Sequence, residues 1–459
     1  MTRTLRLTWV QPEDLLRHEF VQSRAEGVPV DDLVRRWTAA GQDVAAPVSG
    51  ASDSPVPPPV RNLAADLLDE LARRRPAGDP SQPDDLDAIR ALAGPAPVAA
   101  AMPAENELFD RIRGAWWGRA AGCLLGKPVE KIPRAGIRAI AAETGNWPVS
   151  DYFTARGLSS ATGDRWPWNR RSAPTSLREN IDGMPEDDDL NYPMINLGVL
   201  DRSGVDFDTE DVAQAWLADL PAGRTFTAER AAYRNLLNGV AIDATARVRN
   251  PFREWIGALI RADVFGWVCP GDPGRAAGLA WRDARLSHTR NGRYGAMWAA
   301  ALTAAALTES APERVLDRAL AVLPPRSDLA TAVRYGSEVG RSGAGLDEQL
   351  DALHDRYGRL HWVHVLNNAA VIAAAIAGTD GDFTRAIGFA VMAGWDTDSA
   401  AATVGSVLGG LLGHSGLPPE WLTPLDNRVD TSLPGGPRRL DDLASRTVRL
   451  ALGVDHGDQ

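Results

Sequence analysis

Apolar residues recur every three to four positions through most of the chain after residue 105. This helical spacing predicts α-helices over residues 108–125, 228–249, 294–307, 312–322, 366–376, 383–392 and 400–412. Few stretches alternate apolar and polar residues, and no internal repeat is visible. The pattern therefore predicts an all-α fold for the main body. Gly405, Gly409 and Gly413 are spaced by four, which predicts a helix face that a neighbouring helix can approach closely.

The first 105 residues have a different pattern. Polar helices are expected from Pro12 onward and around residues 31–37, and one amphipathic helix over 61–75. The proline-rich stretches 45–59 and 76–84 lack hydrophobic periodicity and read as loosely packed linkers. We therefore expect an accessory segment, residues 1–105, and a main domain, residues 106–459, that folds without it.

Composition narrows the range of partners and compartments. The 60 acidic and 49 basic residues give a net charge of −11, and no basic stripe emerges, so nucleic acid and anionic membrane are poor candidate partners. The apolar runs are too short to span a bilayer. Cys123 and Cys269 cannot build a disulfide framework, and no apolar signal core follows Met1, so we expect a cytoplasmic protein.

Two acidic motifs carry the candidate chemistry. The run from Glu186 to Asp189 contains four consecutive carboxylates, and Asp396 and Asp398 alternate with Thr397 before Ser399. Oxygen ligands of this kind suit hard cations, Mg²⁺ or Mn²⁺, better than zinc or copper. A solvated loop would also explain the first motif, and helix capping would explain Asp396 and Ser399. Capping and metal binding are compatible.

The chain resembles the ADP-ribosylglycohydrolase family from about residue 107 to 452. The resemblance rests on four segments in the same order as in that family. They are the glycine-rich stretch 113–130, the acidic motif 186–189 where the family has Thr-Asp-Asp-Thr, the histidine segment 286–289, and Gly394-Trp395-Asp396-Thr397-Asp398-Ser399 where it has Gly-Gly-Asp-Thr-Asp-Thr.

The resemblance implies an all-α enzyme with two Mg²⁺ ions, Mn²⁺ being possible. The metal ligands it implies are Glu186, Asp187, Asp188, Asp396, Asp398 and Ser399. Asp187 and Asp188 are also carried over as catalytic residues. Glu130 matches a mobile glutamate over the substrate, which gates the site or assists a general base.

Four further residues are candidates for substrate contact. The resemblance points to His288, and to Asn250 and Gly257 in a segment near the distal part of the ligand. Trp395 replaces a glycine of the family and could narrow the pocket or stack on a ring. A structural histidine at 288 and a helix start at Pro251 are equally good explanations.

The segment 165–171 has two interpretations. It forms either a loop over the substrate, with arginines that bind a diphosphate, or a loop held on the surface by its tryptophans. His361 and His364 are expected to be packing residues. Glu186 replaces the family's threonine and adds a charge, and Cys123 stands where many members have aspartate. These departures indicate a substrate that need not be a modified protein.

The leading interpretation is a magnesium-dependent glycohydrolase that cleaves the ribose C1 bond of an ADP-ribose conjugate, a related nucleotide or an N-riboside. The partner is then a small-molecule or ADP-ribosylated substrate. Two alternatives stay open. Two hard cations serve phosphoester hydrolysis equally well, and the same scaffold could bind a ligand without catalysis.

Overall fold

The computed structural model describes residues 7–52, 54–74 and 78–453. Within these ranges the chain forms 24 α-helices and one two-stranded sheet, so the predicted all-α fold is confirmed. The N-terminal helices are α1 (Pro12–Ala25), α2 (Asp31–Ala39), α3 (Pro58–Arg73) and α4 (Leu86–Ala93). The main body begins with α5 (Glu105–Gly126), α6 (Arg134–Glu143), α7 (Ser160–Arg165), α8 (Ala173–Ser176), α9 (Asp188–Ser203), α10 (Thr209–Asp219), α11 (Thr227–Leu237) and α12 (Ile242–Thr245).

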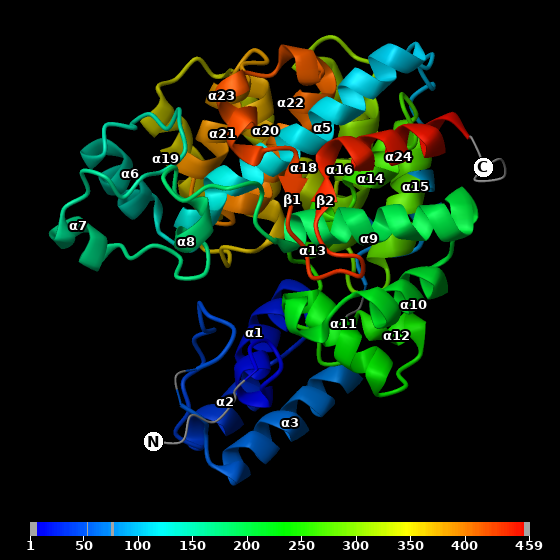
Figure 1. The fold of residues 1–459 in the computed structure, drawn as a ribbon. Coiled ribbons are helices and arrows are strands. Elements are labelled where there is room, and N and C mark those ends of the chain that lie inside the picture. Colours follow the sequence, from blue (N-terminus) through cyan, green and yellow to red (C-terminus); the bar gives the residue numbers. More distant parts are fainter. Residues whose placement is uncertain (1–6, 53, 75–77, 454–459) are drawn as a thin grey trace.

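The remaining helices complete the bundle in Figure 1. They are α13 (Gly257–Ile260), α14 (Asp263–Trp267), α15 (Pro273–Ala284), α16 (Asn291–Ala306), α17 (Pro312–Leu320), α18 (Asp328–Arg341), α19 (Leu346–Tyr357), α20 (Val365–Gly378), α21 (Phe383–Met392), α22 (Thr397–Leu412), α23 (Pro419–Leu422) and α24 (Leu440–Leu452). The strands β1 (Arg428–Val429) and β2 (Arg438–Arg439) pair antiparallel, with Arg428 opposite Arg439.

Helices α5 and α22 pack backbone to backbone through glycines. A Cβ added to Gly405 would lie 2.1 Å from the carbonyl oxygen of Gly118, and one added to Gly409 would lie 2.0 Å from that of Gly114. A methyl group cannot fit there, so the close approach predicted from the glycine spacing is confirmed. The hydroxyl of Thr397 also donates to the Gly126 carbonyl at 2.9 Å. This contact joins the start of α22 to the end of α5.

The N-terminal segment packs against the main body, and α1 lies beside α11 in Figure 1. The buried guanidinium of Arg253 donates to Glu19 at 2.9 Å and to Glu26 at 2.7 Å. The Trp9 ring lies edge-on against the rings of Phe252 and Trp255. One continuous hydrophobic core therefore includes residues from both parts of the chain.

The two proline-rich stretches are also held by specific contacts. The Trp362 indole donates to the carbonyl of Val48 at 3.1 Å, and the Trp281 indole donates to the carbonyl of Asp84 at 2.9 Å. Gln82 is buried against Asn291. Hydrogen bonds to the main body hold these parts of the two stretches in place, and their role as linkers stays a prediction. The boundary near residue 105 stays a prediction.

One predicted helix is divided. Residues 228–249 form α11 and α12, and Gly239 between them has a φ of 69°, a left-handed conformation that ends a helix. No helix in the described part of the chain has both the length and the apolar character needed to cross a membrane.

Candidate functional site

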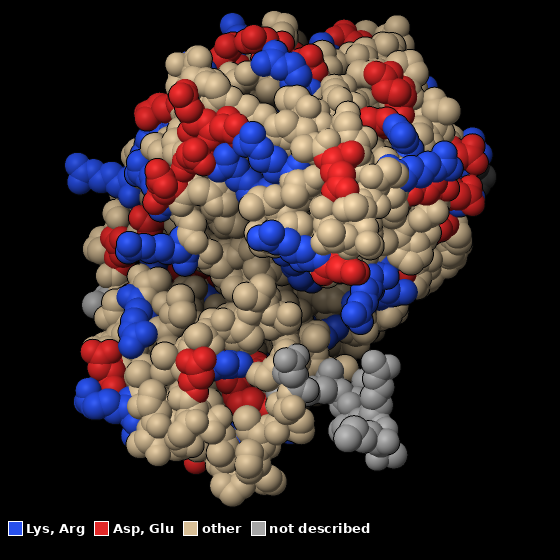
Figure 2. All heavy atoms as spheres, turned by 90° about the vertical axis from the view of Figure 1, so that its left-hand side faces the viewer, with Lys and Arg blue, Asp and Glu red and all other residues tan. Residues whose placement is uncertain are grey.

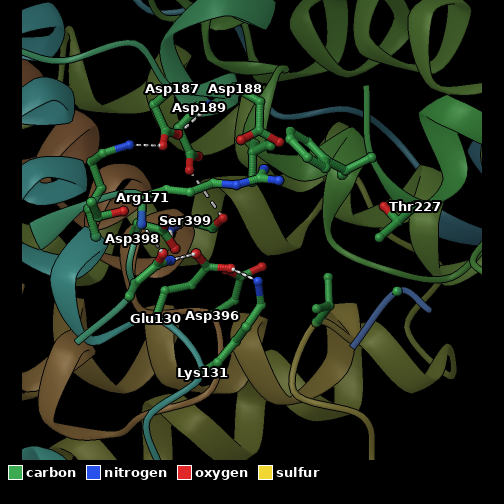
Figure 3. A pocket seen from close by; sticks show the side chains of 18 of the residues that line it. Glu130, Lys131, Arg171, Asp187, Asp188, Asp189, Thr227, Asp396, Asp398 and Ser399 are labelled. Carbon is green, nitrogen blue, oxygen red and sulfur yellow. Dashed lines mark hydrogen bonds and ion pairs between the residues drawn. The ribbon is translucent and has the colours of Figure 1, made fainter. Parts of the chain in front are cut away.

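Both acidic motifs line a single cavity of about 500 Å³. In Figure 3 the carboxylates of Asp187, Asp188 and Asp189 lie on one side and those of Glu130, Asp396 and Asp398 on the other. The predicted residues that line the cavity are Glu130, Glu186, Asp187, Asp188, Gly257, Asp396, Asp398 and Ser399. The fold thus brings together segments about 200 residues apart in the sequence.

Each motif lies at the N-terminal end of a helix. Asp187 is the residue that caps α9, and its side chain accepts a hydrogen bond from the Asp189 amide at 2.9 Å. Asp396 is the residue before α22, and Asp398 and Ser399 lie in its first turn. Unpaired amides and the helix dipole make both ends favourable places for negative charge. Trp395, with a φ of 64°, and Gly394, with a φ of 76°, turn the chain into α22.

One group of carboxylates is suited to a cation. Oxygens of Glu130, Asp396 and Asp398 all lie within 4.8 Å of one another. Burial, and then the charges of Glu130 and Asp187, raise the pKa of Asp398 to about 7. Burial and the Asp398 charge raise the pKa of Asp396 well above its usual range. Mutual repulsion of this kind is relieved when a divalent cation neutralises the carboxylates.

The other group already contains a positive charge. Ligand atoms of Cys123, Asp187 and Asp189 lie within 4.8 Å of one another, and the Lys127 ammonium forms an ion pair with Asp187. Burial alone would raise the pKa of Asp187, but the Lys127 charge lowers it below the usual value. Asp189 accepts from the fully buried guanidinium of Arg119 at 3.1 Å. The negative charge of the group Cys123, Asp187 and Asp189 is therefore neutralised more fully than that of the group Glu130, Asp396 and Asp398.

Asp188 and Ser399 connect the two groups. Burial, and then the charges of Asp187 and Asp398, raise the pKa of Asp188 well above its usual range. The Ser399 hydroxyl donates to Asp189 at 3.2 Å, across the gap between α22 and α9. Among the described residues, Asp188 forms no ion pair comparable to that between Asp187 and Lys127.

Glu186 lines the cavity but is bound to protein groups through both oxygens. Oε1 accepts from the amide of Ser432 at 2.9 Å and from Asn191 at 3.1 Å, and Oε2 pairs with Arg224 at 2.7 Å. Burial would raise its pKa, but these hydrogen bonds lower it below the usual value. The carboxylate joins α9 to the segment after β1, which the sequence did not suggest.

Basic side chains line the same cavity. Lys131 pairs with Glu130 at 3.0 Å, and Asn169 donates to the other Glu130 oxygen at 2.7 Å. Arg170 and Arg171 also line the cavity, and within the described ranges neither guanidinium has an ion-pair partner. In the segment 165–171, Trp166 and Trp168 pack against the core, while Arg170 and Arg171, but not Arg165, line the cavity.

Three predicted substrate-binding residues do not line the cavity. His288 is fully buried, and its Nδ1 lies 2.8 Å from the Ser287 hydroxyl. Asn250 is fully buried and donates to the Ser287 carbonyl at 2.9 Å. The Trp395 ring stacks on His354 with 4.1 Å between ring centroids. These three side chains therefore lie outside the cavity and have structural partners.

The two histidines expected to be packing residues have structural partners. His361 stacks on Trp255 with 4.3 Å between ring centroids, and His364 accepts a hydrogen bond from the Leu366 amide at the start of α20. The remaining candidate, Gly257, lies against the Glu229 carboxylate, where an added Cβ would be 2.3 Å from an oxygen.

Several lining residues have no role in the sequence interpretation. They are Thr8, Trp9, Ser49, Gly50, Lys127, Lys131, Arg224 and Thr227. Lys127 lies inside the glycine-rich motif, three residues before Glu130, so its position was a usable signal. No sequence signal pointed to the N-terminal lining residues, because the proline-rich composition nearby resembles that of a linker.

The donor set fits hard divalent cations. Carboxylate and hydroxyl oxygens from α9, α22 and Glu130 surround the cavity, and the buried Cys123 is the one soft ligand in the two acidic groups of the described chain. Oxygen-rich sets of this type select magnesium-class ions. In the described chain, oxygens of Glu130, Asp396 and Asp398 are close enough together to share one cation, and Asp188 lines the same cavity.

Comparisons with known proteins identify a family for most of the chain. Residues 104–456 match the sequence profile of the ADP-ribosylglycohydrolase family. One solved structure described as an ADP-ribosylglycohydrolase-related protein complex has 21% sequence identity and a TM-score of 0.49, with 76% of this chain and 99% of that chain covered. No curated protein matches the chain.

Proposed function

The chain belongs to the ADP-ribosylglycohydrolase family, and we propose that it is a magnesium-dependent hydrolase of a ribose C1 glycosidic bond. The bond would belong to an ADP-ribose conjugate or a related nucleotide or N-riboside. Glycohydrolase chemistry is the general expectation for the family, whereas magnesium and the nucleotide substrate are our proposals. The resemblance implies two ions, and Mn²⁺ could replace Mg²⁺.

The convergence of the two helix N-termini on one cavity is the observation that carries the proposal. Carboxylates from α9 and α22 meet there, and two of them, the half-buried Asp188 and the buried Asp396, have raised pKa values. Carboxylates this close together repel one another when no cation lies between them. A function that requires bound cations explains why so many acidic groups are gathered here. When bound, the cations would polarise a water molecule and hold the vicinal hydroxyls of a ribose.

Glu130 is the proposed general base. Its carboxylate lines the cavity and is held between Asn169 and Lys131, which fix both oxygens. A carboxylate held in this way can accept a proton from a water molecule as that water attacks C1. Asp188, Asp396 and Asp398 would hold the cations in the proposed site, and Ser399 orients Asp189 through its hydroxyl.

Arg170 and Arg171 favour an anionic substrate over a neutral nucleoside. Both guanidinium groups line the cavity without an ion-pair partner in the described part of the chain. Guanidinium groups bind phosphate oxygens through paired, charge-assisted hydrogen bonds. The substrate would therefore carry phosphate beyond its ribose.

A substrate screen tests the function. Purified protein is incubated with ADP-ribosyl-arginine, ADP-ribosyl-serine, NAD and simple nucleosides, with magnesium and with a chelator. We expect release of a free ribose C1 hydroxyl from at least one phosphate-containing substrate, only with magnesium. Asp398→Ala should lose the activity and bind less metal. Absence of metal binding to the wild-type protein at millimolar magnesium would contradict the proposal.

Phosphoester hydrolysis is the competing activity. Two cation sites can serve that chemistry as well, because they stabilise attacking and leaving oxygens alike. The same reactions distinguish the two activities. Release of inorganic phosphate or of a nucleoside monophosphate, without a free C1 hydroxyl, would replace the glycohydrolase proposal.

A further inference from the structure

The cavity has a wall that comes from outside the family-matched region. Thr8, Trp9, Ser49 and Gly50 line the same cavity as the acidic motifs. The match to the family begins at residue 104, so these four residues lie outside the matched region. They come from two N-terminal segments, residues 8–9 and 49–50. These segments lie side by side, because the Trp9 amide donates to the Gly50 carbonyl at 2.5 Å. We call them the N-terminal wall.

The N-terminal wall is fixed to the main body at several points. Arg230 on α11 donates to both the carbonyl and the hydroxyl of Thr8, each at 2.9 Å. A Cβ on Gly50 would lie 2.4 Å from the Trp9 ring, so the two parts of the wall fit only with glycine at position 50. Such contacts make the wall a fixed surface of the cavity.

Trp362 links the wall to the acidic groups. Its indole donates to the Val48 carbonyl at 3.1 Å, next to Ser49 and Gly50. The Lys131 ammonium lies over the same ring, 5.1 Å from its centroid, and also pairs with Glu130. A substrate that contacts the carboxylates and extends away from them therefore meets the wall and Trp362 on one side.

We propose that the N-terminal wall is a specificity-determining surface that contacts the part of the substrate beyond the ribose. The proposal rests on the function proposed above. Ser49 and Thr8 offer hydroxyls for hydrogen bonds, and the exposed Ser49 lies at the edge of the cavity. A cavity of about 500 Å³ is in the range that encloses a small nucleotide, so its walls decide how long a ligand can be.

The test uses two ligands of different length. Calorimetric titration at millimolar magnesium measures the binding of ADP-ribose and of ribose 5-phosphate to the full-length protein. The variant Ser49→Trp adds a large ring at the edge of the cavity, at a position where the residue is exposed and where we expect the substitution to leave folding intact. Ser54→Trp is the matched control, because Ser54 is exposed, lies in the same stretch and does not line the cavity.

Ser49→Trp should weaken ADP-ribose binding by about tenfold or more and ribose 5-phosphate binding by less than about threefold, since the shorter ligand does not reach the wall. Ser54→Trp should bind both ligands as the wild type does. Unchanged ADP-ribose affinity in Ser49→Trp, or equal weakening for both ligands, overturns the wall proposal alone. If the wild-type protein binds neither ligand, the wall proposal and the proposed function fail together.

Discussion

The ammonium of Lys127 occupies a place among the carboxylates that a cation could otherwise fill. It is buried, pairs with Asp187 and lies 3.3 Å from the Glu186 carbonyl. We expect Lys127→Met to bind Mn²⁺ about tenfold more tightly, because removal of roughly 1.4 kcal/mol of repulsion changes an affinity by that factor. Calorimetric titration with Mn²⁺ measures it, with the surface variant Arg138→Met as control. Weaker binding would mean that Lys127 supports the metal site instead.

Glu186 was predicted to bind metal, and its hydrogen bonds lead to a different expectation. Both oxygens are occupied by Ser432, Asn191 and Arg224. We expect Glu186→Thr to leave the magnesium concentration for half-maximal activity within about threefold of the wild type, and to lower the free energy of unfolding by about 1–3 kcal/mol through lost hydrogen bonds. Activity titrations and urea unfolding measure the two effects. A large rise in the magnesium requirement would restore Glu186 as a ligand.

At the scale of elements, the packing of α5 on α22 places Glu130, which follows α5, beside Asp396 and Asp398. A Cβ at Gly405 would lie 2.1 Å from the Gly118 carbonyl oxygen. We expect Gly405→Ala to lower the free energy of unfolding by about 2 kcal/mol or more, because overpacking outweighs the better helix propensity of alanine.

Gly198 in α9 provides the matched control for this prediction. A Cβ there meets nothing closer than the Arg202 guanidinium at 3.7 Å, so Gly198→Ala should be neutral or stabilising by up to about 1 kcal/mol. Thermal unfolding of both variants makes the comparison. Equal effects of the two substitutions would show that helix propensity, and not contact between α5 and α22, dominates at Gly405.

The same elements explain how much the sequence could predict. The glycine spacing indicated close packing at Gly405 and Gly409, and the order of the acidic motifs indicated that Asp188 and Asp398 share a site. Side-chain direction could not be predicted, because it depends on partners distant in the sequence. Glu186 meets Ser432, and Trp395 meets His354, through packing that local motifs do not encode.

At the scale of the whole molecule, the N-terminal segment is joined to the catalytic body by buried charge. The composition of residues 1–105 suggested a part that the main body could lose. Instead, Arg253 has 6% of its surface exposed and forms ion pairs with Glu19 and Glu26, and Glu254 accepts from Gln22 at 2.8 Å. Removal of one side of a buried ion pair leaves a charge without compensation, which costs about 3–5 kcal/mol.

A protein truncated to begin at Ala104 should therefore lose cooperative unfolding or aggregate. It would expose the rings of Phe252 and Trp255 and leave Arg253 and Asn291 without their N-terminal partners. Calorimetry and size-exclusion chromatography of the truncated and full-length proteins test this expectation. The variant Arg253→Met, which removes the charge within the truncated chain, should recover part of the lost stability. A soluble truncated protein that unfolds cooperatively near the full-length melting temperature would show that residues 104–459 fold alone and that the N-terminal segment acts only at the cavity.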